Sequence, residues 1–380
     1  MKVLVLNAGS STYKSSLFQF EKTSMNPQEP LWNGLVDFDQ HSRKNPAASV
    51  KEMLRKCSFL KDPDEVSFVG HRVVHGGTYF SRPVLINANV KKTIQKLIPL
   101  APLHNQANLL GIEIMESLYP KASQIAVFDT AFHTTIPESA YAYPISKSWQ
   151  KKGIRRYGFH GISHEYCSQR AAGLLNQDIK KLKIITCHLG NGASLAAVKE
   201  GICIDTTMGF TPLEGLMMGT RSGSIDPSIP LFLQREYSLE AENIEKILNG
   251  ESGMKGICGH SDFRKLLKMK AEGKKSAQIA FEMYVQSLRR YIGAMAGSLG
   301  GVDALVFTGG IGENSAFLRT AVCEAFEWMG LALDLRKNEK GLLDSEIGKK
   351  ESKVKILLIH TREDWSIARS CLEFFFLKKN

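Results

Sequence analysis

The sequence lacks the features that mark membrane-spanning and secreted proteins. None of its apolar runs approaches the roughly 18 residues that a transmembrane helix needs. The first apolar run, Val3–Leu6, is far too short for the central segment of a signal peptide, and no cleavage-like site follows it. The seven cysteines are odd in number and form no CxxC motif or zinc-ribbon spacing. We therefore expect reduced thiols, a cytoplasmic location and no membrane partner.

Common nucleotide-binding and hydrolase motifs are also missing. Both Gly-Lys pairs, Gly273-Lys274 and Gly348-Lys349, are followed by another lysine, so there is no GxxxxGK[ST] phosphate loop. The chain has no HRD…DFG set, no GxSxG elbow and no HExxH motif. Any nucleotide must therefore be held by a different kind of fold.

What is present is an ordinary globular composition with an excess of positive charge. Hydrophobic residues make up 43% and charged residues 23% of the 380-residue chain, which excludes a disordered, collagen-like or coiled-coil protein. At roughly 100–200 residues per domain, the length favours two domains. The net charge of +11 suits either nucleic acid or small anionic substrates. We expect no nucleic-acid partner, because no basic run with interleaved aromatic residues occurs; a nucleic-acid binder would instead retain DNA in a salt-sensitive way.

Two strand–loop–strand units, roughly half a chain apart, suggest a duplicated architecture. In the first unit, the apolar segment Val3–Leu6 is followed by the small polar loop Asn7–Thr12 and the β-like segment Lys14–Phe20. In the second, the apolar segment Lys183–Cys187 leads into the loop His188–Ser194 and a further short strand. Such hairpins can surround a phosphate with backbone N–H groups and hydroxyls, although most Gly-Ser loops are ordinary turns.

A third glycine-rich loop and one long helix complete the pattern. The loop Thr308–Asn314 follows the predicted strand Ala304–Phe307. Apolar residues at spacings of 4, 3, 4, 3 and 4 predict a core-facing helix stripe that ends at Gly300-Gly301: Phe281, Val285, Leu288, Ile292, Met295 and Leu299. The alternation of strand and helix signals predicts an α/β fold.

Residues suited to chemistry cluster in blocks outside these elements. The blocks are His71–Gly77, Pro102–Asn105, Phe128–His133, Tyr157–Gly161 and Met208–Asp226. Their density of Gly, His, Arg and Asp indicates a functional site assembled from loops. For any single residue, a capping or turn role is the alternative.

Ten short motifs occur in order along essentially the whole chain: NAGSSTYK, GHRVVHGG, APLHN, VFDTAFH, YGFHG, HLGNG, GFTPLEG, GTRSGSIDP, SDFR and GGIGEN. Together they resemble the motifs of the acetokinase family in the ASKHA (sugar-kinase, Hsp70 and actin) fold group. The resemblance implies an α/β fold of two ribonuclease-H-like domains with an interdomain cleft. It implies a first domain of residues 1–145 plus 366–380, a second of residues 146–365, and a homodimer.

The resemblance also implies a reaction, the reversible in-line transfer of the γ-phosphoryl group of ATP to acetate, giving ADP and acetyl phosphate. It implies Mg²⁺, with Mn²⁺ as a substitute, held directly or through water by Asn7 and Glu363. The implied catalytic residues are Asp129, His160 and Arg221. The implied substrate-binding residues are Arg72, Val74, Leu103, His104, Phe159 and Pro212. The implied nucleotide-binding residues are Lys14, Ser10, Thr12, His188, Leu189, Gly190, Asn191, Gly192, Asp262, Phe263, Arg264, Gly310, Ile311, Gly312, Glu313 and Asn314.

The implied roles make chemical sense on their own. Acetate is already ionised at neutral pH, so catalysis rests on positioning and charge neutralisation. Arginine suits this task because its planar guanidinium binds two oxygens and keeps its charge. Mg²⁺ typically takes one or two protein ligands and keeps its waters. Because Asp129 has no proton to remove, we expect it to orient Arg72, Arg221 or a metal-bound water, with a structural ion pair as the alternative.

One departure from the family pattern and two alternatives stay open. The usual TNEE near the end reads Thr361-Arg362-Glu363-Asp364, so Arg362 brings a positive charge that either weakens Mg²⁺ binding or adds a phosphate contact. The alternatives are a propionate or butyrate kinase of the same family and an ATP-binding module without turnover. Val74 is larger than alanine and favours the shorter acid, with a preference for acetate over propionate of at most about 1–3 kcal/mol.

Overall fold

The structure divides into two compact units. The computed structural model describes residues 1–9, 12–20, 27–37 and 45–377 of the chain. Unit 1 comprises Met1–Thr134 and Arg362–Asn380, and unit 2 comprises Thr135–Thr361. The chain thus leaves unit 1 after residue 134 and returns to it after residue 361. The sequence-based prediction put the two crossings at 145/146 and 365/366.

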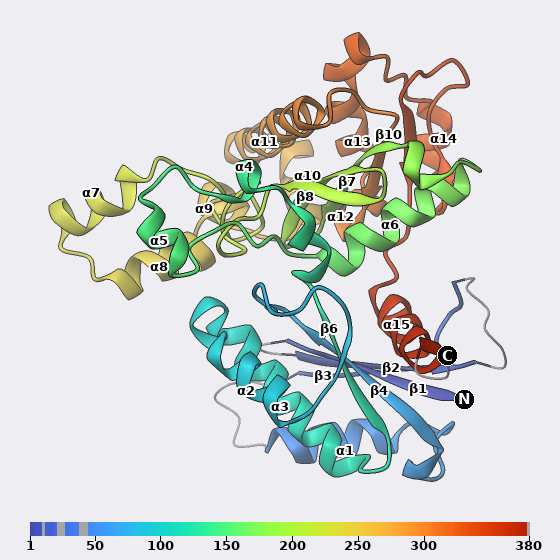
Figure 1. Ribbon diagram of the computed structural model, residues 1–380. Helices are drawn as coiled ribbons and strands as arrows, with labels where there is room; N and C mark the ends of the chain where they lie inside the picture. Colours follow the sequence, from blue (N-terminus) through green and yellow to red (C-terminus); the bar gives the residue numbers. More distant parts are fainter. Residues whose placement is uncertain (10–11, 21–26, 38–44, 378–380) are drawn as a thin grey trace. The chain divides into compact units, whose positions relative to one another are not determined.

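Unit 1 is built on a six-stranded mixed sheet with the strand order β3-β2-β1-β4-β6-β5 (Figure 1). Strands β1, β2 and β3 form an antiparallel meander, whereas β1, β4 and β6 run parallel to one another. The carboxyl ends of these three parallel strands therefore meet at the same edge, where α/β proteins commonly bind their ligands. The strands are β1 Lys2–Ala8, β2 Thr12–Gln19, β3 Trp32–Asp37, β4 Val66–Val73, β5 Val84–Leu85 and β6 Ser123–Phe128.

Helices pack on both faces of this sheet. Helices α1 (Pro46–Arg55) and α3 (Pro102–Leu118) share a buried apolar cluster with β1 and β2. The last helix, α15 (Glu363–Leu377), packs on the other face, where Gly70 of β4 leaves room for it. A Cβ atom on Gly70 would lie 2.6 Å from Ile367 Cγ2 and 2.9 Å from Cys371 Sγ. A shorter helix, α2 (Ala88–Lys96), contacts α3.

Unit 2 repeats the strand order of unit 1. Its sheet runs β9-β8-β7-β10-β12-β11, with β7, β8 and β9 antiparallel and β7, β10 and β12 parallel. This repeat confirms the duplicated architecture that the two strand–loop–strand units predicted. The strands are β7 Lys183–Leu189, β8 Ala193–Lys199, β9 Ile202–Thr206, β10 Ala304–Thr308, β11 Ser345–Glu346 and β12 Lys355–Leu358.

The predicted long helix is confirmed as α11 (Lys275–Leu299). All six residues of its predicted stripe are buried, and it ends at Gly300 with a left-handed φ of 63°. Helix α11 contacts β7, β8 and β9, while α6 (Gly161–Leu174) contacts β7, β8 and β10. The other helices are α4 Glu138–Tyr141, α5 Lys147–Lys151, α7 Ser228–Tyr237, α8 Ala241–Gly250, α9 Gly253–Cys258, α10 Phe263–Ala271, α12 Gly309–Asn314, α13 Ala316–Cys323 and α14 Leu335–Lys340.

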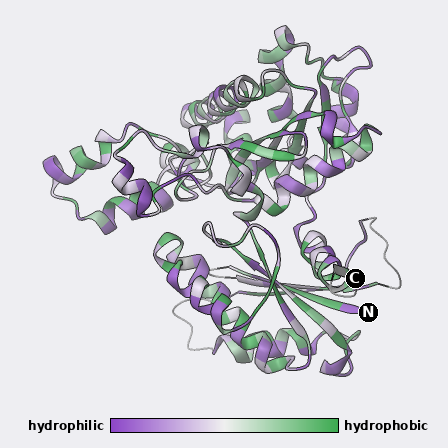
Figure 2. Cartoon of the chain, viewed as in Figure 1, coloured by the Kyte–Doolittle hydropathy of each residue, from purple (hydrophilic) through white to green (hydrophobic). Residues whose placement is uncertain are grey.

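In each unit, the distribution of hydrophobic residues follows the division into a central sheet and the helices that cover it. Figure 2 shows hydrophobic strands, with helices that carry both hydrophobic and hydrophilic residues. Strand β10 is buried at all five positions, as expected for a strand covered on both faces. Among the residues that the structure describes, no helix is long and apolar enough to cross a membrane.

Candidate functional site

Three predicted site residues of unit 1 meet at the carboxyl edge of its sheet. Asn7 near the end of β1 is paired with Arg72 near the end of β4, and Asp129 directly follows β6. The guanidinium of Arg72 donates from Nε to both carboxylate oxygens of Asp129, at 3.0 and 3.1 Å, and from Nη2 to Oδ2 at 2.7 Å. Its Nη1 lies 3.4 Å from Asn7 Oδ1 and 3.8 Å from Glu363 Oε2, at the start of α15. The sheet topology thus brings a cation, an amide oxygen and two carboxylates together.

Arg72 and Asp129 form a buried ion pair in which each charge stabilises the other. Burial raises the pKa of Asp129, which is 1% exposed, against the opposing attraction of Arg72. Burial also disfavours the charge of Arg72, but Asp129 and Glu363 together raise its pKa above the ordinary value. Arg72 therefore stays cationic, with Asp129 fixing its orientation through a two-point contact.

Two buried asparagines of α3 hold the chain just beyond Arg72. Asn108 accepts the Val74 N–H at 3.0 Å and donates to the Ala8 carbonyl at 2.7 Å. Asn105 accepts the His75 N–H and donates to the His75 carbonyl, both at 3.0 Å. These contacts fix the backbone of Val74, a predicted substrate-binding residue that is 8% exposed. Sequence reasoning missed Asn108, although an asparagine three positions after Asn105 on a largely apolar helix is a visible signal.

The remaining predicted residues of unit 1 lie around this edge. Lys14 of β2 is paired with Asn7 across the hairpin, and Thr12 donates to Asp37 at 3.0 Å. Leu103 and His104 lie in the first turn of α3, and His104 is one of the groups that oppose the effect of burial, which raises the pKa of Asp129. Ser10 lies outside the described residues.

Unit 2 brings three other predicted residues together around the loop after β7. A Cβ atom on Gly192 would lie 3.4 Å from Arg221 Nη1 and 3.6 Å from His160 Nε2. The rings of His160 and His188 stack with centroids 4.3 Å apart. His160 adopts a left-handed φ of 57°, just before α6 begins, and its Nδ1 lies 2.9 Å from Ser194 Oγ. The arginine and the histidine thus both lie close to the Gly192 loop.

Arg221 differs from Arg72 in having neutral partners. Its Nη1 donates to the Pro212 carbonyl at 3.3 Å and approaches Met218 Sδ at 3.9 Å. Burial lowers the pKa of this guanidinium. The carbonyl contact also explains how Pro212 enters the site, through its backbone. Phe159, the residue before His160, is 1% exposed.

A partly buried polar network fixes the long loop that carries Pro212 and Arg221. The Glu214 carboxylate accepts hydrogen bonds from Tyr143 Oη and from Arg156 Nη2, the latter at 2.7 Å. Arg156 Nη1 donates to the carbonyls of residues 206 and 207 at 3.1 Å, and Tyr143 Oη accepts the Phe210 N–H at 2.8 Å. Sequence reasoning missed Tyr143 and Arg156, which lie outside every quoted motif.

Two of the three predicted nucleotide-binding segments of unit 2 lie side by side. Strand β10 pairs in parallel with β7, with Thr308 opposite His188, so α12 begins next to the His188–Gly192 loop. These segments contain His188, Leu189, Gly190, Asn191 and Gly192, and Gly310, Ile311, Gly312, Glu313 and Asn314. The third segment begins helix α10, where Asp262 caps Arg264 N–H at 2.9 Å and pairs with the Arg264 guanidinium at 2.8 Å. Phe263 in the same segment is 6% exposed and packs against the rings of α11.

The family model described as the acetokinase family matches residues 37–369. The chain belongs to the acetokinase family. It is 50% identical to an acetate kinase of Gloeothece citriformis, over 98% of each chain. Among solved structures, an acetate kinase of Porphyromonas gingivalis is 40% identical with a TM-score of 0.90, covering 98% of this chain and 99% of the other. A propionate kinase of Francisella tularensis is 39% identical with a TM-score of 0.87, covering 97% and 98%.

Family membership confirms several of the sequence-based predictions. The two-domain α/β fold and a kinase enzyme of the acetokinase family are confirmed. The family also implies a nucleotide substrate. The individual site residues, the metal and the domain boundaries stay predictions.

The predicted metal ligands have a donor set that fits Mg²⁺. Asn7 offers an amide oxygen and Glu363 a carboxylate, and oxygen donors in small number are what Mg²⁺ prefers in proteins. The positive charge of the neighbouring Arg362 is engaged elsewhere, because its Nη1 pairs with Glu29. The Arg362 guanidinium therefore has a carboxylate partner of its own in unit 1, although that partner is largely exposed.

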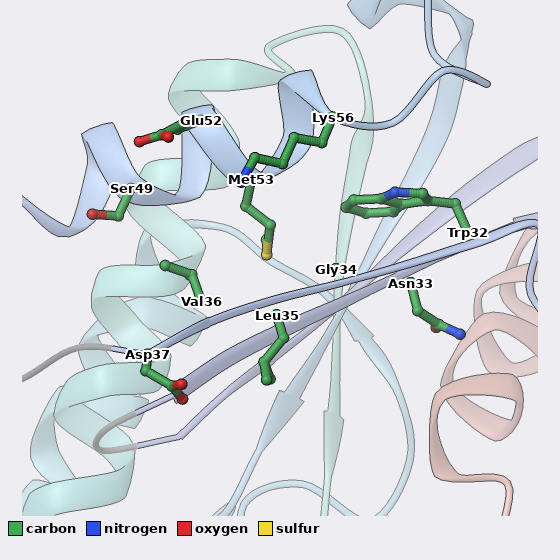
Figure 3. Close-up of a pocket in the computed structure, with 10 residues that line it drawn as sticks. All are labelled: Trp32, Asn33, Gly34, Leu35, Val36, Asp37, Ser49, Glu52, Met53 and Lys56. Carbon is green, nitrogen blue, oxygen red and sulfur yellow. The ribbon is translucent and has the colours of Figure 1, made fainter.

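A separate pocket of about 430 Å³ lies in unit 1 between the edge strand β3 and helix α1 (Figure 3). The indole of Trp32 lies over Gly34, where a Cβ atom would come within 2.3 Å of the ring. The pocket contains none of the predicted site residues, although Thr12 donates to its lining residue Asp37. It is therefore distinct from the predicted site.

Proposed function

We propose that this protein is an acetate kinase that transfers the γ-phosphoryl group of ATP reversibly and directly to acetate, with Mg²⁺. The observation that carries the proposal is the pair of arginine-centred clusters at the family motifs. Arg72 sits among Asn7, Asp129 and Glu363 in unit 1, and Arg221 sits with His160 at the Gly192 loop of unit 2. Two anions that must react need fixed cations of this kind.

Arg72 is the proposed binding residue for the acceptor carboxylate. Asp129 occupies its Nε and Nη2, so the guanidinium is held in one orientation. Because an ionised carboxylate attacks phosphorus without losing a proton, Asp129 has no base role in this proposal. It orients Arg72, which is one of the roles that the sequence left open. Val74, fixed by Asn108, is proposed to limit the length of the acid.

Arg221 and His160 are the proposed residues that neutralise the transferring phosphoryl group. A guanidinium that keeps its charge and has neutral partners has donors available for phosphoryl oxygens. The Gly192 loop and the start of α12 supply backbone groups for the nucleotide. Mg²⁺, held by Asn7 and Glu363, would supply charge neutralisation at the phosphate oxygens when bound.

Acetate is the proposed acceptor because the 50% identical relative is named an acetate kinase. A propionate kinase is the second candidate, because a solved propionate kinase matches nearly as well as a solved acetate kinase. One added CH₂ gains about 0.8 kcal/mol of transfer free energy, or roughly fourfold, if the pocket admits it. A preference for acetate therefore requires a steric limit such as Val74.

We also propose a cytoplasmic homodimer. Support for a second copy comes from a group of exposed apolar residues on and beside α7: Ile225, Ile229, Leu231, Phe232 and Tyr237. Light scattering on the eluted peak of a sizing column measures the mass. A 42.2 kDa species at micromolar concentration would contradict the dimer.

The activity is tested by measuring ADP formation from MgATP with acetate, propionate and butyrate in parallel, trapping the acyl phosphate with hydroxylamine. We expect acetate-dependent ADP release with stoichiometric hydroxamate, and the highest kcat/KM for acetate. A higher kcat/KM for propionate would favour the second candidate. Nucleotide binding without turnover of any acid would contradict both and indicate an ATP-binding module.

A further inference from the structure

The side chain of Glu313 points into unit 2, although the residue belongs to a predicted nucleotide-binding motif. Glu313 is 9% exposed. Its Oε1 accepts the backbone N–H groups of Gly309 and Thr361, both at 3.0 Å. Its Oε2 lies 2.6 Å from His360 Nδ1. The carboxylate is thus bound at both oxygens by groups of the protein itself.

These contacts join Glu313 to His360 and Thr361, which lie 47 and 48 positions further along the chain. Gly309 is the first residue of α12, beside the loop after β7. Thr361 is the last residue of unit 2, directly before the chain returns to unit 1. Two residues later, Glu363 begins α15 and faces Arg72. Glu313 therefore connects two segments. One is the nucleotide segment, which begins at Gly309, and the other is residues 359–361, the crossing segment by which the chain leaves unit 2.

The Glu313 carboxylate that makes these contacts is ionised. Burial raises the pKa of Glu313, but the hydrogen bonds from His360 and from the Thr361 and Gly309 N–H groups outweigh it and lower the pKa below the ordinary value. Hydrogen bonds to an ionised acceptor are roughly twice as strong as those between neutral groups. Loss of the charge should therefore loosen both segments together.

The other end of α12 is held by a second buried charge. Arg319 is 1% exposed and donates from Nη1 to the carbonyls of Gly312 and Glu313, at 2.8 and 3.0 Å. Its Nε and Nη2 bind the side-chain and backbone oxygens of Asn338 at 2.6 and 2.8 Å. Burial lowers its pKa to about 10. With the Gly312–Glu313 end fixed, loss of the Glu313 side-chain contacts should move the start of α12 at Gly309 rather than the whole helix.

We propose that Glu313 is a positioning residue that couples the nucleotide segment at Gly309 to the crossing segment at Thr361, rather than a side-chain ligand of the nucleotide. The kinetic part of this inference rests on the proposed function. The structural part does not, because the coupling acts between two backbone segments of unit 2.

The test is the variant Glu313→Gln, which keeps the size of the side chain and removes its charge. Hydrogen exchange read by mass spectrometry should become faster in peptides covering 308–314 and 355–361 together, by about tenfold or more. In the assay with acetate, kcat should fall about tenfold, because the nucleotide segment loses its fixed position. Glu327→Gln, on an exposed glutamate of the same unit, is the matched control and should change neither readout.

A second variant keeps the inference testable if Glu313→Gln does not fold. His360→Gln removes one of the four groups that contact the Glu313 carboxylate, the others being the Thr308 hydroxyl and the Gly309 and Thr361 N–H groups, and should give the same pattern at smaller amplitude, about threefold. The double variant should be no more affected than Glu313→Gln alone, because the contact that His360→Gln removes, between His360 and the Glu313 carboxylate, is already weakened by Glu313→Gln.

Three outcomes would overturn the inference. A lower melting temperature with unchanged exchange in both peptides and unchanged kcat would mean a merely structural role. Faster exchange in one segment alone would mean no coupling. A raised KM for ATP with unchanged exchange would make Glu313 a direct nucleotide ligand. Absence of turnover in the unmodified protein would contradict the proposed function but leave the exchange test intact.

Discussion

The two arginines at the predicted site are held in opposite ways. In unit 1, Arg72 forms a two-point ion pair with Asp129 and lies near Glu363, so its charge is balanced within the protein. In unit 2, the Arg221 guanidinium contacts a carbonyl oxygen and a thioether sulfur. The pKa of Arg72 is raised by its carboxylates, and that of Arg221 is lowered by burial. The difference suggests that Arg72 is built to hold a fixed orientation and Arg221 to receive a charge from a ligand.

This contrast also suggests that the two arginines have different roles in the reaction. A cation whose charge is already balanced can bind a small carboxylate weakly and reversibly. A cation with neutral partners gains most when an anion develops or arrives next to it, because a low-dielectric surrounding strengthens the attraction. Changes at Arg221 should therefore act on kcat, and changes around Arg72 should act on the KM for the acceptor.

The largest expected effect is that of Arg221→Ala on turnover. Removal of an arginine that neutralises a transferring phosphoryl group should lower kcat by about 10³-fold or more. The dissociation constant of ATP, measured by calorimetry, should change by less than about threefold. Arg336→Ala, at an exposed arginine of α14 in unit 2, is the control. A variant within tenfold of the unmodified kcat would remove Arg221 from the mechanism.

The next effect is that of Asp129→Asn on stability and acceptor binding. Loss of one member of a buried ion pair leaves the other charge without its main partner, which typically costs about 3 kcal/mol of unfolding free energy. The KM for acetate should rise, because Arg72 loses its orientation. Urea unfolding and steady-state kinetics measure the two effects. Glu116→Gln breaks a more exposed ion pair with Lys91 in the same unit and should cost less than about 1 kcal/mol. Equal losses in both variants would contradict the assigned role of the pair.

The smallest expected effect is that of Val74→Ala on acid preference. Removing two methyl groups directly after β4 should raise kcat/KM for propionate relative to acetate by roughly fourfold to tenfold. The ratio is read from parallel assays with both acids. Val84→Ala, on the short edge strand β5, serves as a control away from Arg72. An unchanged ratio would mean that Val74 does not limit the length of the acid.

The parts of the fold that follow local patterns were predictable from sequence. The two strand–loop–strand units and the stripe of α11 are periodic features of short segments, and both are confirmed. The motifs around Arg72, Asp129 and Arg221 were also visible, since glycine, histidine and charged residues gather there. Their contacts with one another were not, because the Arg72–Asp129 pair joins residues 57 positions apart.

The supporting contacts were the least predictable. Tyr143 and Glu214 are 71 positions apart, and Asn108 reaches Ala8 over 100 positions. No local pattern specifies such pairs, because each depends on the packing of elements distant in sequence. The inward orientation of Glu313 was missed for the same reason, since its partner Thr361 belongs to another segment.

Thermal unfolding of Arg221→Met, with and without inorganic phosphate, tests the contrast between the two arginines most directly. If the charge of Arg221 is held for an anion, the variant should be at least as stable as the unmodified protein without phosphate, because a partly buried charge with neutral partners is removed. Phosphate at about 100 times its dissociation constant should then stabilise the unmodified protein by roughly 2.7 kcal/mol and the variant much less. Arg336→Met, at an exposed arginine of the same unit, should behave like the unmodified protein. A variant that is less stable without phosphate, or that gains as much from phosphate, would contradict the account.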